Sequence, residues 1–200
     1  MCLKFADVAI PVDKAKQSNL SFYTGLLASA PSLVTWMMRH KFEPTNKTCM
    51  DFLRDLRVAT PPNVKIGIAG FCWGGRYAVR AGKDEYKVDV AGSKRHLVDA
   101  IVALHPSNLD LPADVEEVGV PLSFAWGFED TNTKIELKGK VEAIHERENK
   151  GGRKVPDVDH KVYKPGRHGF AVRGNPDDPQ EKACLVDSEK QVLEWFGRYL

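Results

Sequence analysis

The sequence predicts an α/β fold in which a mostly parallel sheet carries helices on both faces, formed by a single domain over residues 1–200. Short β-rich apolar runs alternate with helix-compatible segments, which is the pattern of such a sheet. The sequence contains no internal repeat and no low-complexity tract. A chain of 200 residues that is 42% hydrophobic and 28% charged can bury one sizeable core, so we expect no second domain.

The apolar spacing places the individual elements. Met50, Leu53 and Leu56 recur every three to four residues and predict a helix over residues 45–57, which Pro61-Pro62 ends before the next strand. Four predicted strands begin near residues 64, 99, 120 and 159. Residues 133–154 predict an exposed, charged helix. A last helix over residues 179–200 is predicted to dock on the core through Ala183, Val186, Val192, Leu193 and Phe196.

The most informative stretch is VKIGIAGFCWGGRYAVRAG, residues 64–82, in which a strand gives way at once to a helix. A strand that reverses sharply into a helix holds its apex residue in a strained conformation, and Gly70, Gly74 and Gly75 supply small neighbours. The apex is Cys72, near a helix N-terminus that favours a thiolate, so we interpret it as a nucleophile. The alternative is an ordinary buried cysteine, because free cysteines are commonly buried.

Two further polar residues follow predicted strands. Asp130 comes just after the strand that ends at Gly127, and His168 comes after the strand that ends near Tyr163. The carboxyl ends of parallel strands share one edge, where distant side chains converge on a ligand. Taken singly, Asp130 could cap a helix that begins near Thr131, and His168 could be a turn histidine bonded to backbone.

Together the three residues predict nucleophilic catalysis. The chain order of nucleophile, acid and histidine is the one that α/β-hydrolases use. His168 would take the thiol proton of Cys72 and later protonate the leaving group. Asp130 would fix the imidazole tautomer and stabilise its charged form.

The same residues carry a resemblance to a known family. The FCWGG elbow, the strand-end aspartate in GFED, the HGF turn and the closing amphipathic helix resemble the dienelactone hydrolase (carboxymethylenebutenolidase-like) family, and FCWGG followed by Arg-Tyr-Ala is most similar to its eukaryotic branch. The likeness runs from about Lys4 to Leu200. It implies an α/β-hydrolase fold and hydrolysis of a small ester or enol-lactone through a thioester, with Cys72, Asp130 and His168 at the triad positions.

The chain departs from the family at its start. Family members open with several strands, and a loop there gives a backbone N–H to the oxyanion hole and, in studied relatives, a glutamate that helps to activate the cysteine. The sequence shows neither. Residues 4–13 resemble the end of a family helix and the strand that follows it, in shortened form, as in an N-terminally shortened domain. The backbone N–H of Trp73 is then the one oxyanion donor that we assign. A sheet lacking its first strands would expose an edge that a homodimer could cover.

Four more residues are candidates for contact with substrate. Arg76 could bind a substrate carboxylate, although pairing with a sheet-edge carboxylate is the more common role of such an arginine. His105, at the end of the second strand, shares the predicted edge, but a structural turn histidine fits it better. Phe170 and Arg173 could line the acyl pocket or serve as loop packing, and the sequence leaves both open.

Composition and residue spacing argue against several classes of partner and cofactor. The net charge of +2 comes from 29 basic and 27 acidic residues without a run of like charge, so we expect neither nucleic acid nor a membrane surface as a partner. No apolar stretch approaches a membrane span, and a cytoplasmic location follows. The cysteines form no C-x-x-C pair and the histidines no H-x-x-x-H, so we expect no disulfide, no metal and no other cofactor.

Two functions of different class follow. The first is a cysteine-dependent hydrolase of small esters or enol-lactones, with the substrate as its partner. The second is a catalytically impaired homologue that keeps the fold and acts as a binding or interaction protein, or a shortened product of an active enzyme's gene. A redox-sensing thiol is a weaker third candidate, because no resolving cysteine is evident.

Overall fold

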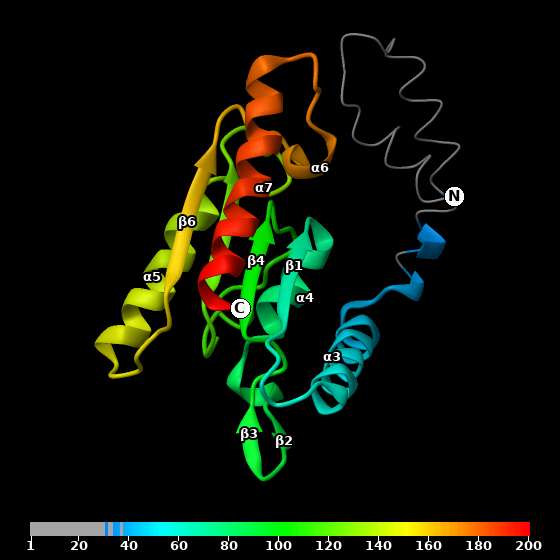
Figure 1. The fold of residues 1–200 in the computed structure, drawn as a ribbon. Coiled ribbons are helices and arrows are strands. Elements are labelled where there is room, and N and C mark those ends of the chain that lie inside the picture. Colours follow the sequence, from blue (N-terminus) through cyan, green and yellow to red (C-terminus); the bar gives the residue numbers. More distant parts are fainter. Residues whose placement is uncertain (1–30, 32–33, 37) are drawn as a thin grey trace. The chain divides into compact units, whose positions relative to one another are not determined.

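The computed structural model describes residues 31, 34–36 and 38–200 (Figure 1). The chain divides into two compact units, Met1–Thr48 and Cys49–Leu200. Helix α3 (Phe42–Ala59) begins in the first unit and confirms the helix predicted over residues 45–57. The shortened strand predicted within residues 4–13 lies outside the described residues. The sheet and all candidate site residues belong to the second unit.

The sheet of this second unit has four parallel strands in the order β1-β4-β5-β6. Strands β4 and β5 are buried along their whole length, as expected of parallel strands covered on both faces. All four predicted strands are therefore confirmed, and their carboxyl ends share one edge of the sheet (Figure 1). Their bounds are β1 Gly67–Phe71, β4 Ala100–Leu104, β5 Leu122–Gly127 and β6 Val158–Tyr163.

Helices cover both faces of this sheet, as predicted. The row of paired residues that runs from Gly70 of β1 to His160 of β6 faces α4 (Trp73–Arg80) and α5 (Glu136–Lys150). A Cβ on Gly70 would meet Ala78 of α4, and the His160 ring lies 6.4 Å from the ring of His145 in α5. On the other face, the side chain of Gln191 in α7 (Pro179–Tyr199) bonds to Ser123 of β5.

Helix α7 begins where the sequence predicts, but part of its buried face differs. Asp178 caps its N-terminus by accepting hydrogen bonds from the N–H groups of Gln180 and Glu181. Val192 and Phe196 pack against the core as predicted, whereas Ala183, Val186 and Leu193 are exposed. The apolar pattern was misleading because polar residues that find hydrogen-bond partners occupy much of the buried face. The residues of α7 that are buried are Glu181, Cys184, Ser188, Gln191 and Trp195.

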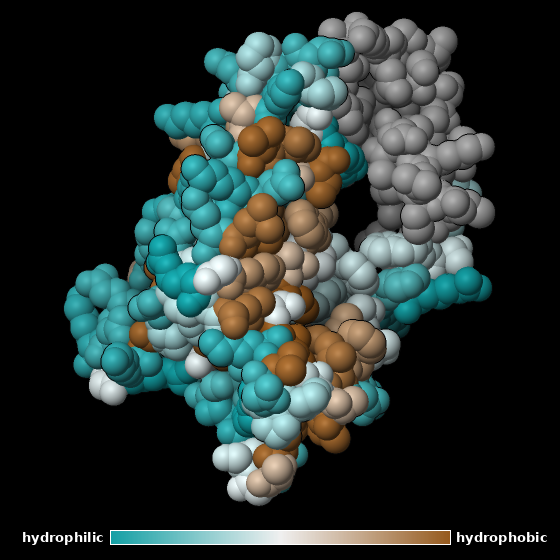
Figure 2. Space-filling model, in the orientation of Figure 1, coloured by the Kyte–Doolittle hydropathy of each residue, from teal (hydrophilic) through white to brown (hydrophobic). Residues whose placement is uncertain are grey.

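Apolar surface is visible along α7 in Figure 2, where Val186, Leu193 and Leu200 are among the exposed hydrophobic residues.

The remaining elements are small. A separate antiparallel pair and two short helices complete the unit: η2 Asp84–Tyr86, β2 Val88–Val90, β3 Ser93–Arg95 and α6 Phe170–Arg173.

A buried ion pair ties α3 to the sheet. The Arg57 guanidinium is fully buried and donates to the carboxylate of Asp99 at 2.5 Å and to the carbonyl of Leu97 at 3.2 Å. The same carboxylate accepts the backbone N–H of Ile66 at 2.7 Å. Since Ile66 precedes β1 and Asp99 precedes β4, this contact fixes the starts of the two strands that carry Cys72 and His105 at their far ends.

Candidate active site

The residues that follow β1 form a strained elbow. Cys72 has φ 51° and ψ −120°, and positive φ is costly for a residue with a side chain. Helix α4 starts at the next residue, Trp73. The strain predicted for the apex residue is therefore present, and the cysteine stands between a strand end and a helix N-terminus.

Two of the three predicted glycines are required by close contacts. A Cβ on Gly70 would lie 2.5 Å from the Cβ of Ala78, and a Cβ on Gly75 would lie 2.7 Å from the Cβ of Pro106. The third prediction was wrong: a Cβ on Gly74 would meet no described atom within 4 Å. A side chain at Gly74 would therefore point into open space, although its carbonyl oxygen lies 2.7 Å from where a Cβ would stand on Gly70.

This difference gives a matched pair of stability variants. Gly75→Ala forces a methyl group into Pro106 and should destabilise the fold by about 1–3 kcal/mol. Gly74→Ala adds a methyl group in open space within a helix and should be neutral or stabilising by up to about 1 kcal/mol. Urea denaturation of both variants measures the difference, and equal stabilities would contradict the packing described for the elbow.

His168 lies between the sulfur of Cys72 and the carboxylate of Asp130. Its Nε2 is 2.9 Å from the Sγ of Cys72, and its Nδ1 is 2.9 and 3.0 Å from the two carboxylate oxygens of Asp130. The imidazole and the carboxylate are buried, and the sulfur is partly buried. Residues that follow β1, β5 and β6 thus meet at the shared edge of the sheet, as the sequence predicts.

Asp130 also orders its own loop. Its Oδ1 accepts the backbone N–H groups of Asn132 at 2.8 Å and Thr133 at 2.9 Å. Asp130 does not cap a helix, which was the alternative for this residue, because α5 begins only at Glu136 and these bonds form a turn instead. The turn and the bond to His168 coexist, so the carboxylate is held in place independently of the histidine.

Close backbone contacts join this loop to the one that carries His168. The Cα of Gly127 lies against Gly166, and a Cβ on Gly127 would come 2.0 Å from the carbonyl oxygen of Gly166. Gly166 has φ 54°, a conformation that favours glycine. The N–H of Glu129 donates to the carbonyl of Pro165 at 2.8 Å. The ends of β5 and β6 are therefore fixed to each other just before Asp130 and His168.

The electrostatics favour a charged pair. Burial raises the pKa of the Cys72 thiol, but the hydrogen bond and positive charge of His168 outweigh burial, and the pKa is lowered overall. Burial lowers the pKa of His168, but hydrogen bonds to Asp130 and Cys72 outweigh it and raise the pKa to about 9. Both directions favour a thiolate and an imidazolium near neutral pH.

The arrangement agrees with comparisons to known proteins. The sequence profile of the dienelactone hydrolase family matches residues 28–200. The chain belongs to the dienelactone hydrolase family. A carboxymethylenebutenolidase homolog of Xenopus tropicalis is 30% identical over 141 residues, which are 68% of this chain and 49% of that protein. Hydrolase tropI of Talaromyces stipitatus is 26% identical over 68% of this chain and 46% of its own length. The chain spans about half the length of these curated relatives.

Solved structures share the fold. The structure named m3DLH is 18% identical, with a TM-score of 0.54, over 92% of this chain and 70% of that one. A dienelactone hydrolase-like promiscuous phosphotriesterase, P91, from metagenomic libraries is 17% identical, with a TM-score of 0.52, over 91% of this chain and 69% of that one. These similarities establish the α/β-hydrolase fold that the sequence predicts.

The other predicted residues of this dienelactone hydrolase family member lie around the elbow. The Trp73 backbone N–H faces the sulfur, and its hydrogen bond helps to lower the pKa of Cys72. Arg76 pairs with the fully buried carboxylate of Asp114 at 2.7 Å. Of its two predicted roles, this is the ion pair within the protein, although Asp114 lies in a loop after β4 and not at the sheet edge.

Three of these residues cluster near His168. His105 is 1% exposed, and its Nδ1 accepts the backbone N–H of Cys72 at 3.2 Å, so it supports the elbow from behind. Phe170 is buried and packs 5.4 Å from the His105 ring and 4.8 Å from the ring of Tyr163. Arg173 is half-buried beside Gly169, with guanidinium nitrogens 2.9 Å from where a Cβ would stand on that glycine.

The sequence interpretation missed Ser107. Its Oγ lies 3.6 Å from the Sγ of Cys72, and its backbone N–H donates to the carbonyl of Cys72 at 2.9 Å. Ser107 follows the predicted strand end at His105-Pro106, so the strand-end argument that identified Asp130 and His168 also applies to it.

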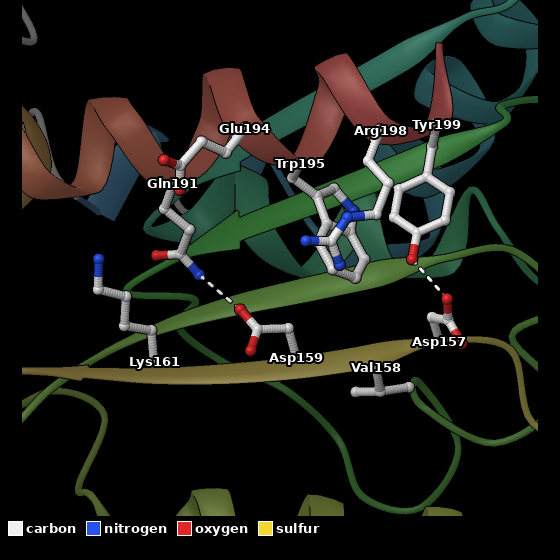
Figure 3. A pocket seen from close by; sticks show the side chains of 9 residues that line it. All are labelled: Asp157, Val158, Asp159, Lys161, Gln191, Glu194, Trp195, Arg198 and Tyr199. Atoms are coloured by element: carbon white, nitrogen blue, oxygen red, sulfur yellow. Dashed lines mark hydrogen bonds between the residues drawn. The ribbon is translucent and has the colours of Figure 1, made fainter.

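A pocket of about 360 Å³ lies elsewhere, between β6 and the C-terminal half of α7 (Figure 3). Two hydrogen bonds join residues that line it: the Tyr199 hydroxyl donates to Asp157 at 2.6 Å, and the Gln191 amide donates to Asp159 at 3.4 Å. Cys72, His168 and Asp130 do not line it, so it is separate from the candidate active site.

Within residues 31, 34–36 and 38–200, no three histidine, cysteine or acidic side chains are grouped as metal ligands. The helices in the described part of the chain include none that is long and apolar enough to cross a membrane.

Proposed function

We propose that this chain hydrolyses small esters or enol-lactones through a thioester formed on Cys72. The observation that carries the proposal is the contact of 2.9 Å between the Cys72 sulfur and His168 Nε2, with His168 Nδ1 held by Asp130. A thiolate paired with an imidazolium is ready to attack an acyl carbon without a metal or cofactor.

Each residue then has a role. The Cys72 thiolate forms a bond to the acyl carbon, and His168 gives its Nε2 proton to the departing alkoxide or enolate. Water, deprotonated at Nε2, then attacks the thioester, the C–S bond breaks, and its electron pair returns to sulfur. The buried Asp130 keeps the imidazole oriented and stabilises its charge. The Trp73 N–H is the proposed donor to the oxyanion.

Three residues are proposed to shape substrate binding. Phe170 and His105 form a buried wall beside His168, and Arg173 supplies positive charge nearby. Arg76 is less suited to this role because Asp114 already occupies its guanidinium. Thiolates react best with activated acyl groups, so lactones and activated esters should be better substrates than amides.

The acyl-enzyme is the direct test of this mechanism. After rapid mixing with p-nitrophenyl acetate and acid quenching, peptide mass spectrometry should find acetyl on the peptide that contains Cys72. Cys49, whose thiol pKa is raised by burial, is the internal control and should stay unmodified. Turnover without acetyl on Cys72, or equal acetylation of Cys49, would count against a Cys72 thioester. A folded protein with no turnover and no acetylation would favour the alternative of a binding protein.

A further inference from the structure

The turn of three residues after β4, His105-Pro106-Ser107, holds Cys72 at three atoms. The N–H of Cys72 donates to His105 Nδ1 at 3.2 Å, and its carbonyl accepts the N–H of Ser107 at 2.9 Å. The third contact is the 3.6 Å separation between the Ser107 hydroxyl and the Cys72 sulfur. Both backbone groups and the reactive atom of the strained residue are therefore bonded to one turn.

Neighbouring contacts fix this turn. Pro106 packs against Gly75 of α4, where a Cβ would come within 2.7 Å. The carbonyl of Pro106 accepts the Thr133 hydroxyl at 2.8 Å, which joins the turn to the loop of Asp130. These contacts hold the backbone of Ser107 beside Cys72, so its side chain reaches the sulfur without a rearrangement of the turn.

The direction of the hydroxyl proton follows from its surroundings. Ser107 is buried, and the contact with Cys72 is its one side-chain hydrogen bond within the described residues. When the sulfur is a thiolate, it can only accept, so the Ser107 hydroxyl donates to it. A hydrogen bond to the charged form stabilises that form, and this contact is among the causes that lower the pKa of Cys72.

We propose that Ser107 is a catalytic residue whose hydroxyl donates a hydrogen bond to the Cys72 thiolate. The proposal rests on the cysteine mechanism above and adds a side-chain donor to the sulfur beside His168 and the backbone N–H of Trp73. In the resting protein the thiol proton moves from sulfur to His168 Nε2, while Ser107 keeps its own proton. During hydrolysis of the thioester, the C–S bond breaks and the hydroxyl again stabilises the departing thiolate.

The test is the pH profile of Cys72 alkylation by iodoacetamide, followed on the Cys72 peptide by mass spectrometry. Ser107→Ala keeps the backbone bond to Cys72 and removes only the hydroxyl. The half-maximal pH should rise by about one unit, which is roughly a tenfold slower alkylation on the rising part of the profile. Ser107→Thr retains a hydroxyl and should remain closer to the parent protein.

Ser188→Ala is the matched control, because Ser188 is also a buried serine but donates to the carbonyl of Leu185 in its own helix. Its profile should equal that of the parent protein. An unchanged profile for Ser107→Ala, or an equal shift for Ser188→Ala, would overturn the role of Ser107. Should Ser107→Ala fail to fold, the comparison of Ser107→Thr with Ser107→Val, which differ only in a hydroxyl and a methyl group, provides the same readout.

The two proposals fail in different ways. Acetylation of Cys72 by the ester together with an unchanged Ser107→Ala profile removes only the role of Ser107. Turnover without acetylation of Cys72 removes the cysteine mechanism itself.

Discussion

Cys72→Ala should reduce the hydrolysis of p-nitrophenyl acetate and of dienelactone by about 10⁴-fold or more, because removal of a nucleophile leaves only substrate binding and the oxyanion donor. The substitution removes one sulfur atom at the surface of the elbow, so the fold should persist. Initial rates with purified parent and variant proteins measure the effect.

Cys49→Ala is the control for loss of a thiol, since Cys49 lies in α3, a helix that contributes none of the candidate site residues. Its rate should equal that of the parent protein. If Cys72→Ala and the parent protein hydrolysed both substrates at the same rate, Cys72 would not be the nucleophile.

His168→Gln should have the second-largest effect. Glutamine keeps a polar side chain but can neither take the thiol proton nor carry a positive charge beside the sulfur. Hydrolysis should fall by roughly 10³–10⁴-fold. Alkylation of Cys72 at pH 7 should slow by about 30-fold, because a free thiol of pKa about 8.5 is only about 3% ionised there.

A second histidine–aspartate pair serves as the matched control. His96 Nε2 lies 2.9 Å from the carboxylate of Asp84, and neither residue is among the described side-chain partners of Cys72, which are His105, Ser107 and His168. His96→Gln should leave both hydrolysis and alkylation at the parental rate. A similar loss in the two variants would mean that general destabilisation, and not the position of His168, causes the effect.

The sequence predicts the geometry of the three central residues well, for a physical reason. Parallel strands in a covered sheet bring their carboxyl ends to one edge, so strand-end positions can be recognised without coordinates. Cys72, Asp130 and His168 each follow a short apolar run, and the structure brings them within hydrogen-bonding distance. The strained φ of Cys72 also follows from the Gly-x-Cys-x-Gly pattern at the point where a predicted strand gives way to a helix.

Other features depend on packing that the pattern does not encode. The buried face of α7 contains Ser188 and Gln191, whose hydrogen bonds offset the cost of burying them. Apolar spacing cannot identify such residues and assigned Val186 and Leu193 to the core instead. The contact of Ser107 with the sulfur likewise depends on the path of the turn after His105, which its residue types do not determine.

The proposed mechanism requires that the sulfur of Cys72 be a thiolate paired with the His168 imidazolium at neutral pH. The most direct measurement is the rate of Cys72 alkylation by iodoacetamide in the parent protein between pH 6 and 8. The lowered pKa of Cys72 and the pKa of about 9 for His168 predict a rate across this range that is faster, and rises less steeply with pH, than the rate of a free thiol. A rate that rises about tenfold per pH unit, as for a free thiol of pKa 8.5 or above, would contradict the account.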